Sequence, residues 1–140
     1  MKYLLDTCVI SELVNKTPNA RVVEWLKQQD SDSLYLSSVT VGEIKKGIAK
    51  RGDDDRAIKL KRWLQTTILG TFADRVLPVD CSVALEWGRI CGVSERNGKK
   101  RPAIDALIAA TAFVHKMKLV TRNVDDMAGM GVPIFNPFAE

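Results

Sequence analysis

The stretch KYLLDTCVISE, residues 2–12, opens with a short apolar run that ends abruptly at an acid. Residues 3–5 have the length and character of a strand that is buried on both faces, as in the centre of a parallel sheet. Asp6 would then follow at the carboxyl end of that strand, and a helix would begin directly behind it. Open α/β sheets bind their ligands at this edge. We therefore expect Asp6 to lie at the mouth of a functional site.

Short apolar runs alternate with longer helical patterns along the rest of the chain. We expect further strands at residues 34–36, 75–79, 119–121 and 132–135. We also expect Ser38 to cap the helix that follows the second strand, and a polar turn over 122–126. This alternation is typical of an α/β domain in which a mostly parallel sheet lies between helices. No internal repeat or linker interrupts it, so we predict a single domain over residues 1–140.

Composition excludes several classes of protein. Twenty-one Lys and Arg residues against seventeen Asp and Glu leave a net charge of +4, which only mildly favours an anionic partner. The three cysteines lack a CxxC pair and the chain has one histidine, which argues against a zinc site or a disulfide framework. Neither a signal peptide nor an apolar run of about 18 residues is evident. We expect a cytoplasmic protein without a membrane partner.

Four acids recur at comparable points of the predicted sheet. Asp6 follows the first strand, Glu43 lies one turn into the helix after the second, and Asp126 lies in the turn after the fourth. Asp105 lies one turn into the helix that precedes the fourth strand. In a doubly wound sheet such points can converge on one cleft.

Convergence of four carboxylates would need a physical reason. Two carboxylates about 4 Å apart repel each other by roughly 4 kcal/mol at an effective dielectric constant of about 20. Domains are stable by only about 5–15 kcal/mol, so such a cluster calls for protonation, a cation partner or a bound divalent metal. Oxygen ligands without a His or Cys cluster favour Mg²⁺ or Mn²⁺. Such ions activate water and stabilise charge on a phosphate.

Each acid also has a purely structural interpretation. Asp6 could cap the first helix, and Glu43 could pair with Lys46. Asp105 could complement a helix dipole, and Asp126 could be an ordinary turn residue. Only the four acids taken together, at comparable points of the predicted sheet, predict a functional site.

Hydroxyl groups and a cation flank the acids. Thr7 and Thr121 could hold a water or orient a carboxylate, and they could equally be capping or turn residues. Arg122 is placed to contact a phosphate or to form a structural ion pair.

A basic run precedes the helix of Asp105, and it could attract an RNA backbone or simply be a solvated loop. The tentative RNA-binding residues there are Lys99, Lys100 and Arg101.

Four stretches in order carry a family resemblance that spans nearly the whole chain. They are LLDTCVISEL at 4–13, SSVTVGEIKKGI at 37–48, RPAIDALIAATA at 101–112 and LVTRNVDDMAGMGVPIFNP at 119–137. With them the chain resembles the PIN-domain ribonucleases, and specifically the VapC-type toxins of bacterial toxin–antitoxin pairs.

The resemblance implies a PIN-like three-layer α/β/α fold with five strands, and it assigns the metal-binding, catalytic acids to this chain. They are Asp6, Glu43, Asp105 and Asp126, the last because the family acid follows three residues after the Asn of a TRN-like turn. The chain departs from the family pattern at Met127, where an aromatic residue is usual, and at Cys8, where Asn is common.

The resemblance further implies an activity and partners. It implies Mg²⁺-dependent cleavage of RNA, with Mn²⁺ as a substitute and transfer RNA as one substrate class. It also implies a homodimer in the bacterial cytoplasm, bound into a larger complex by a small cognate antitoxin. A catalytically silent RNA-binding module is the alternative. A phosphatase of the haloacid-dehalogenase type is disfavoured, because Cys8 stands where that pattern needs a second Asp.

Overall fold

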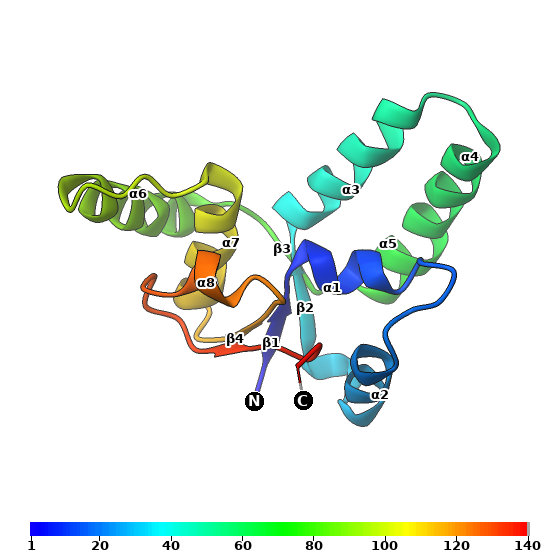
Figure 1. Cartoon of the computed structure of the whole chain (residues 1–140), viewed down its shortest axis with the longest axis horizontal. Coiled ribbons are helices and arrows are strands. Elements are labelled where there is room, and N and C mark those ends of the chain that lie inside the picture. Colours follow the sequence, from blue (N-terminus) through cyan, green and yellow to red (C-terminus); the bar gives the residue numbers. More distant parts are fainter. Residues whose placement is uncertain (140) are drawn as a thin grey trace.

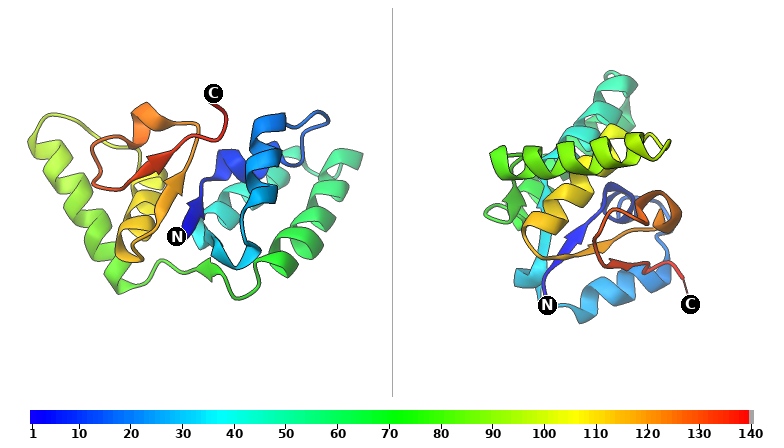
Figure 2. Two further views of the ribbon diagram at one scale, coloured as in Figure 1. Left: turned by 90° about the horizontal axis from the view of Figure 1, so that it is seen from below. Right: turned by 90° about the vertical axis from the view of Figure 1, so that its left-hand side faces the viewer.

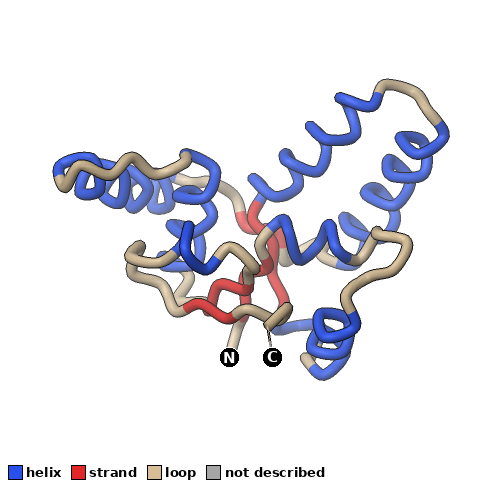
Figure 3. Tube along the Cα trace, viewed as in Figure 1, coloured by secondary structure: helices blue, strands red, loops and turns tan. Residues whose placement is uncertain are grey.

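The computed structural model describes residues 1–139 and contains a five-stranded, all-parallel sheet between two groups of helices (Figure 1; Figure 3). The strand order is β3-β2-β1-β4-β5, so β1 is central, as its short apolar run predicts. The strands are β1 (Tyr3–Leu5), β2 (Leu34–Ser37), β3 (Val76–Leu77), β4 (Lys118–Val120) and β5 (Ile134–Phe135). The predicted α/β fold with a five-stranded sheet is confirmed.

Helices cover both faces of the sheet, and Figure 2 shows the two groups on either side of the strands. One group comprises α1 (Thr7–Glu12), α2 (Ala20–Gln28), α3 (Ser38–Arg51), α4 (Asp55–Arg62) and α5 (Leu69–Thr71). A π-helical segment, Trp63–Ile68, joins α4 to α5, and a 3-10 turn, Ser31–Ser33, precedes β2. The other group comprises α6 (Cys81–Arg96), α7 (Ala103–Val114) and α8 (Val124–Met127). Within residues 1–139, no helix is both long and apolar enough to cross a membrane.

Successive residues of the central strands belong to two separate hydrophobic cores. Leu5 and Val120 pack with the group of α1 to α5, whereas Leu4 and Leu119 pack with the group of α6 to α8. All four side chains are at most 1% exposed. Because neighbouring side chains of a strand point to opposite faces, a strand covered on both sides has to be apolar throughout. The two cores therefore hold β1, and the acid behind it, in a fixed position.

The helix that carries Glu43 begins one residue earlier than its predicted cap. Ser37 ends β2 with an extended backbone, and its Oγ accepts a hydrogen bond from the Val39 N–H at 3.1 Å. Ser38 is the exposed first residue of α3, so the prediction that it caps this helix is wrong. Ser37 is buried and β2 continues through it, which leaves the capping geometry to the earlier serine.

Two further differences concern short elements near the sheet. The predicted turn over 122–126 overlaps the one-turn helix α8, which runs on to Met127, so Asp126 lies on a helix. The third strand spans only Val76–Leu77 of the predicted 75–79. Pro78 follows it, and proline has no N–H with which to continue a ladder.

We expect Ser37→Ala to destabilise the protein by about 1 kcal/mol, because the substitution leaves an N-terminal N–H of α3 without its acceptor. Urea unfolding followed by circular dichroism measures the change. Ser38→Ala is the matched control and should lie within about 0.5 kcal/mol of the unsubstituted protein. An equal loss at both positions would contradict the assignment of the cap.

Candidate functional site

Asp6 is a buried carboxylate held by two short hydrogen bonds. It follows β1 directly, caps α1, and is 3% exposed. Its Oδ1 accepts from the Thr7 N–H at 2.7 Å, and its Oδ2 accepts from the Thr121 hydroxyl at 2.7 Å. Each carboxylate oxygen has two lone pairs; Oδ2 also accepts a long hydrogen bond from the Cys8 thiol at 3.8 Å, so it is Oδ1 that retains acceptor capacity. The capping interpretation of Asp6 is thus confirmed, and the cap leaves the carboxylate able to take a further ligand.

Thr7 links Asp6 to a second acid. Its N–H binds Asp6, while its hydroxyl donates to Glu43 Oε1 at 2.6 Å. The hydroxyl of Thr40 lies 3.1 Å from that of Thr7 and is fully buried. Sequence reasoning missed Thr40, although its position one turn before Glu43 on α3 places both on one helix face. No ion pair of Glu43 with Lys46 is found among residues 1–139.

Thr121 and Cys8 complete the surroundings of Asp6. The backbone N–H of Asp6 donates to the carbonyl of Val120 at 2.9 Å, which brings the ends of β1 and β4 together. Thr121 donates to Asp6 and accepts from the backbone N–H of Asn123 at 2.9 Å. The Cys8 sulfur lies 3.8 Å from Asp6 Oδ2 and accepts from the backbone N–H of Arg122 at 3.5 Å. Both predicted hydroxyls therefore contact a candidate acid directly.

The four acids are coupled electrostatically. Burial raises the pKa of Asp6; hydrogen bonds from Thr121 and Thr7 oppose that rise, and the charge of Glu43 adds to it. Burial also raises the pKa of Asp105, in the first turn of α7, and the charges of Asp6, Asp126 and Glu43 raise it further. No cation of residues 1–139 is among the causes of the Asp105 shift. The structure thus brings Asp6, Glu43 and Asp126 close enough to Asp105 for their charges to act on it.

The chemistry of this group suits a divalent cation, while its present geometry is open. Carboxylate oxygens are the ligands that Mg²⁺ and Mn²⁺ prefer, and a cation would relieve the repulsion that raises the pKa of Asp105. In the part of the chain that the structure describes, no three His, Cys, Asp or Glu side chains form a cluster close enough to hold an ion. Asp126 is exposed and Glu43 is half-buried.

The predicted basic residues divide into accessible and buried members. Lys99 and Lys100 are exposed on the loop between α6 and α7. Arg122 is exposed, and its guanidinium carbon lies 4.8 Å from the centre of the Phe138 ring. Arg101 is only 9% exposed and donates to the backbone carbonyl of Asp126 at 3.1 Å. Lys99, Lys100 and Arg122 are therefore accessible to RNA, whereas Arg101 is buried.

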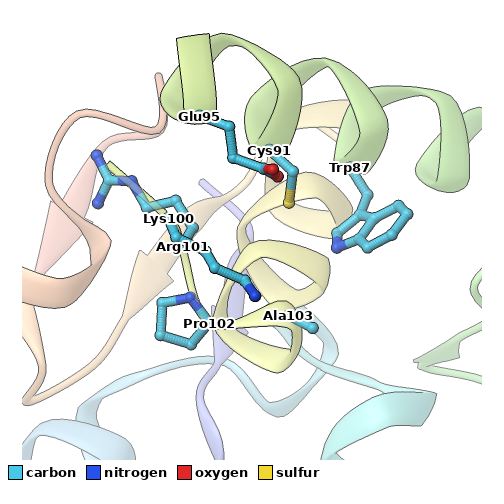
Figure 4. A pocket seen from close by; sticks show the side chains of 7 residues that line it. All are labelled: Trp87, Cys91, Glu95, Lys100, Arg101, Pro102 and Ala103. Atoms are coloured by element: carbon cyan, nitrogen blue, oxygen red, sulfur yellow. The ribbon is translucent and has the colours of Figure 1, made fainter. Parts of the chain in front are cut away.

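Two hollows flank the start of α7 and the helix α8. One, of about 440 Å³, is polar and includes Arg122, Asn123 and Asp126 in its lining, so it adjoins the acidic group. The other, of about 430 Å³, lies between α6 and the segment 100–103 (Figure 4). It is lined largely by apolar groups such as Trp87 and Cys91, and it contains none of the four acids. The polar hollow is the one that belongs to the candidate site.

The fold is an α/β protein with a five-stranded parallel sheet, and Asp105 is coupled to three further acids near the carboxyl edge of that sheet, where open α/β sheets bind their ligands. The chain belongs to the PIN-domain family, whose model matches residues 3–130. The resemblance found in the sequence is confirmed by this match.

Curated relatives and solved structures agree with that assignment. The chain is 38% identical to Toxin FitB of Neisseria gonorrhoeae over 135 residues, which cover 96% of this chain and 97% of the relative. It is 33% identical to VapC ribonuclease Y4jK of Sinorhizobium fredii, with 96% of each chain covered. The crystal structure of FitAcB from Neisseria gonorrhoeae matches with a TM-score of 0.91 and 38% identity, covering 99% of each chain.

We expect Asp105→Asn to stabilise the protein at neutral pH when divalent metal is removed with EDTA. The folded-state pKa of Asp105 is raised, so ionisation of this group costs more in the folded than in the unfolded state. Each 1 kcal/mol of relief corresponds to a rise in Tm of roughly 4 °C in a domain of this size. The gain should shrink as the pH falls and should vanish well below the ordinary pKa of about 3.9, where the carboxyl is neutral in both states.

Differential scanning calorimetry at pH 7.5 and pH 5 measures this difference. The matched control is Asp125→Asn, which removes an exposed carboxylate from α8 and should change Tm little. A Tm for Asp105→Asn that is equal to or below that of the unsubstituted protein at pH 7.5 would show that Asp105 is not under repulsion.

Proposed function

We propose that this chain, as a single PIN domain over residues 1–140, is the toxin of a type II toxin–antitoxin pair and a divalent-metal-dependent endoribonuclease. Two relatives are named a toxin and a VapC ribonuclease, and both align over nearly their whole length. The observation that carries the enzymatic part is the coupling of Asp105 to the three other acids.

Asp6, Glu43, Asp105 and Asp126 are the residues that would hold the ion. Mg²⁺ is the expected cofactor, with Mn²⁺ as a substitute, because the donors are all carboxylate oxygens. Such an ion would supply positive charge against a phosphate and would make a water molecule more acidic. Binding would draw the exposed Asp126 side chain towards the buried Asp6.

The remaining residues of the site orient the acids and attract the substrate. Thr7 and Thr121 hold the two oxygens of Asp6, so this carboxylate keeps one orientation before substrate arrives. The exposed cations Lys99, Lys100 and Arg122 would attract an RNA backbone, whose phosphates dominate the affinity of nucleic-acid-binding proteins. An acidic ion site with a basic rim suits hydrolysis of RNA phosphodiester bonds, and transfer RNA is the substrate class that we propose.

Partners follow from the same relatives. A solved structure described as FitAB bound to an IR36 DNA fragment matches with a TM-score of 0.91 and 38% identity. We propose that this chain likewise binds a small cognate antitoxin, forms a homodimer, joins a larger toxin–antitoxin complex and acts in the bacterial cytoplasm.

A catalytically silent RNA-binding module is the second candidate. The observation that favours it is the open arrangement of the acids, which form no cluster close enough to hold an ion within residues 1–139. Such a module would bind RNA equally well in EDTA and would leave it intact.

RNA cleavage distinguishes the two candidates. We expect the purified protein to cut RNA stem-loops in Mg²⁺ or Mn²⁺ and not in EDTA, as seen by mapping RNA ends on a gel. Asp6→Asn and Asp126→Asn should each reduce the rate by at least about 100-fold, since an ion contributes several kcal/mol to such reactions.

The matched control is Asp125→Asn, one residue before the proposed ligand, which should retain the rate of the unsubstituted protein. Cleavage that survives Asp6→Asn would refute the proposed chemistry. Equal losses at Asp125 and Asp126 would refute the choice between the two neighbouring acids.

The link from Thr7 to Glu43 gives a further test. Thr7→Val keeps the shape of the side chain and removes the hydroxyl that binds Glu43 Oε1. We expect it to weaken Mn²⁺ binding about tenfold, as the loss of a group that orients a ligand commonly does. Thr7→Ser keeps the hydroxyl and should bind nearly as tightly as the unsubstituted protein. Isothermal titration calorimetry measures both constants, and identical affinities for the Val and Ser variants would refute the role of this hydroxyl.

A further inference from the structure

We propose that Arg101 is a positioning residue that sets the spacing between two of the acids, Asp105 and Asp126. The inference rests on the proposed function and deepens it, because it assigns to a side chain next to the acids a role other than RNA contact. Arg101 acts through the backbone of α8 and touches no reacting group.

The guanidinium group of Arg101 is committed to contacts inside the protein. Its Nη1 donates to the backbone carbonyl of Asp126 at 3.1 Å, and its Nε donates to Ser94 Oγ at 3.3 Å. The residue is 9% exposed, and among residues 1–139 it makes no ion pair. Arg101 lines the edge of the apolar hollow, and Figure 4 shows its guanidinium pointing away from Trp87. Arg101 is therefore a buried side chain that links Ser94 of α6 to the backbone of Asp126 in α8.

The hydrogen bond from Arg101 to Asp126 connects α7 and α8, the two helices that carry Asp105 and Asp126. Arg101 directly precedes Pro102, the N-cap of α7, and Asp105 lies in the first turn of that helix. At its other end the guanidinium binds the carbonyl of Asp126, within the single turn of α8. The last carbonyls of a helix lack partners within the helix, so a donor from elsewhere stabilises its end. One side chain thus joins the start of α7 to the end of α8.

Gly129 shows that this contact is tightly fitted. Its φ is +85°, a conformation that favours glycine, and a Cβ built there would lie 2.8 Å from Arg101 Nη2. A side chain at this position would displace a guanidinium that is already hydrogen-bonded at two other atoms. The backbone after α8 therefore passes close to the guanidinium of Arg101, and the positive φ at residue 129 favours glycine there.

The choice of arginine supports a positional role. A guanidinium presents donors in a rigid plane, so it can bind Ser94 and Asp126 at a fixed separation, whereas a lysine is a single flexible point charge. Burying a charge without an acidic partner costs free energy. A neutral side chain would fill the same space without that cost but would not fix the carbonyl of Asp126.

Loss of the hydrogen bond between Arg101 and the carbonyl of Asp126 should make α8 more mobile and weaken ion binding, without changing RNA binding. We expect Arg101→Lys and Gly129→Ala to raise the Kd for Mn²⁺ by about tenfold, measured by isothermal titration calorimetry on the full chain. Hydrogen exchange should become faster at the amides of Met127 and Ala128, which close the turn of α8. The matched control is Arg62→Lys at an exposed position, which should change neither measurement.

The kinetics separate a positioning role from a phosphate contact. A positioning residue lowers kcat and leaves the KM for RNA within about twofold, with activity restored in part by raised Mn²⁺. If Arg101 contacted phosphate, Arg101→Lys would raise the KM for RNA and leave Mn²⁺ affinity unchanged, and Arg101→Gln would reduce the salt dependence of RNA binding by about one charge. That result would overturn the inference.

The two proposals fail in different ways. A folded Arg101→Lys variant with unchanged Mn²⁺ affinity and unchanged exchange in α8 overturns the positioning role, even if the unsubstituted protein cuts RNA. If the unsubstituted protein cuts no RNA, the proposed function fails, while Mn²⁺ affinity and hydrogen exchange still decide the role of Arg101. Should Arg101→Lys fail to fold, Gly129→Ala tests the same contact from the opposite side.

Discussion

The repulsion that three other carboxylates exert on Asp105 is the constraint around which the proposed site is arranged. Burial and the charges of the three other acids raise the pKa of Asp105, with no cation of residues 1–139 to offset them. In a domain stable by about 5–15 kcal/mol such repulsion is a sizeable cost. Thr7 and Thr121 restrain the carboxylate of Asp6 directly, whereas Arg101 restrains the backbone of α8.

These restraints divide the site into a fixed half and an adjustable half. Asp6 is buried, both of its oxygens are hydrogen-bonded, and it is joined through Thr7 to Glu43. Asp105 and Asp126 are more exposed, and Asp126 is held through its carbonyl. If the proposed ion binds, two acids are already in place and the other two would have to move towards it. This division agrees with the absence of a formed ion cluster within residues 1–139.

The sequence predicts the fixed half well because local patterns determine it. An apolar run that ends at Asp6 suffices to place a central strand and the acid behind it. The choice between Ser37 and Ser38 as a cap depends on where β2 ends, which two adjacent serines do not reveal. Arg101 follows two exposed lysines and looks like part of a solvated run. Its burial depends on a contact with Asp126, 25 residues away, which no local pattern records.

Titration of the Asp105 side-chain carboxyl by NMR, with and without Mg²⁺, tests the coupling of the four acids most directly. Without metal we expect its pKa to lie above the ordinary value of about 3.9 and to fall in Asp6→Asn, which removes one repelling charge. In saturating Mg²⁺ we expect the pKa to fall below the ordinary value. A pKa near 3.9 that neither Mg²⁺ nor Asp6→Asn shifts would contradict a coupled, ion-binding group at this edge of the sheet.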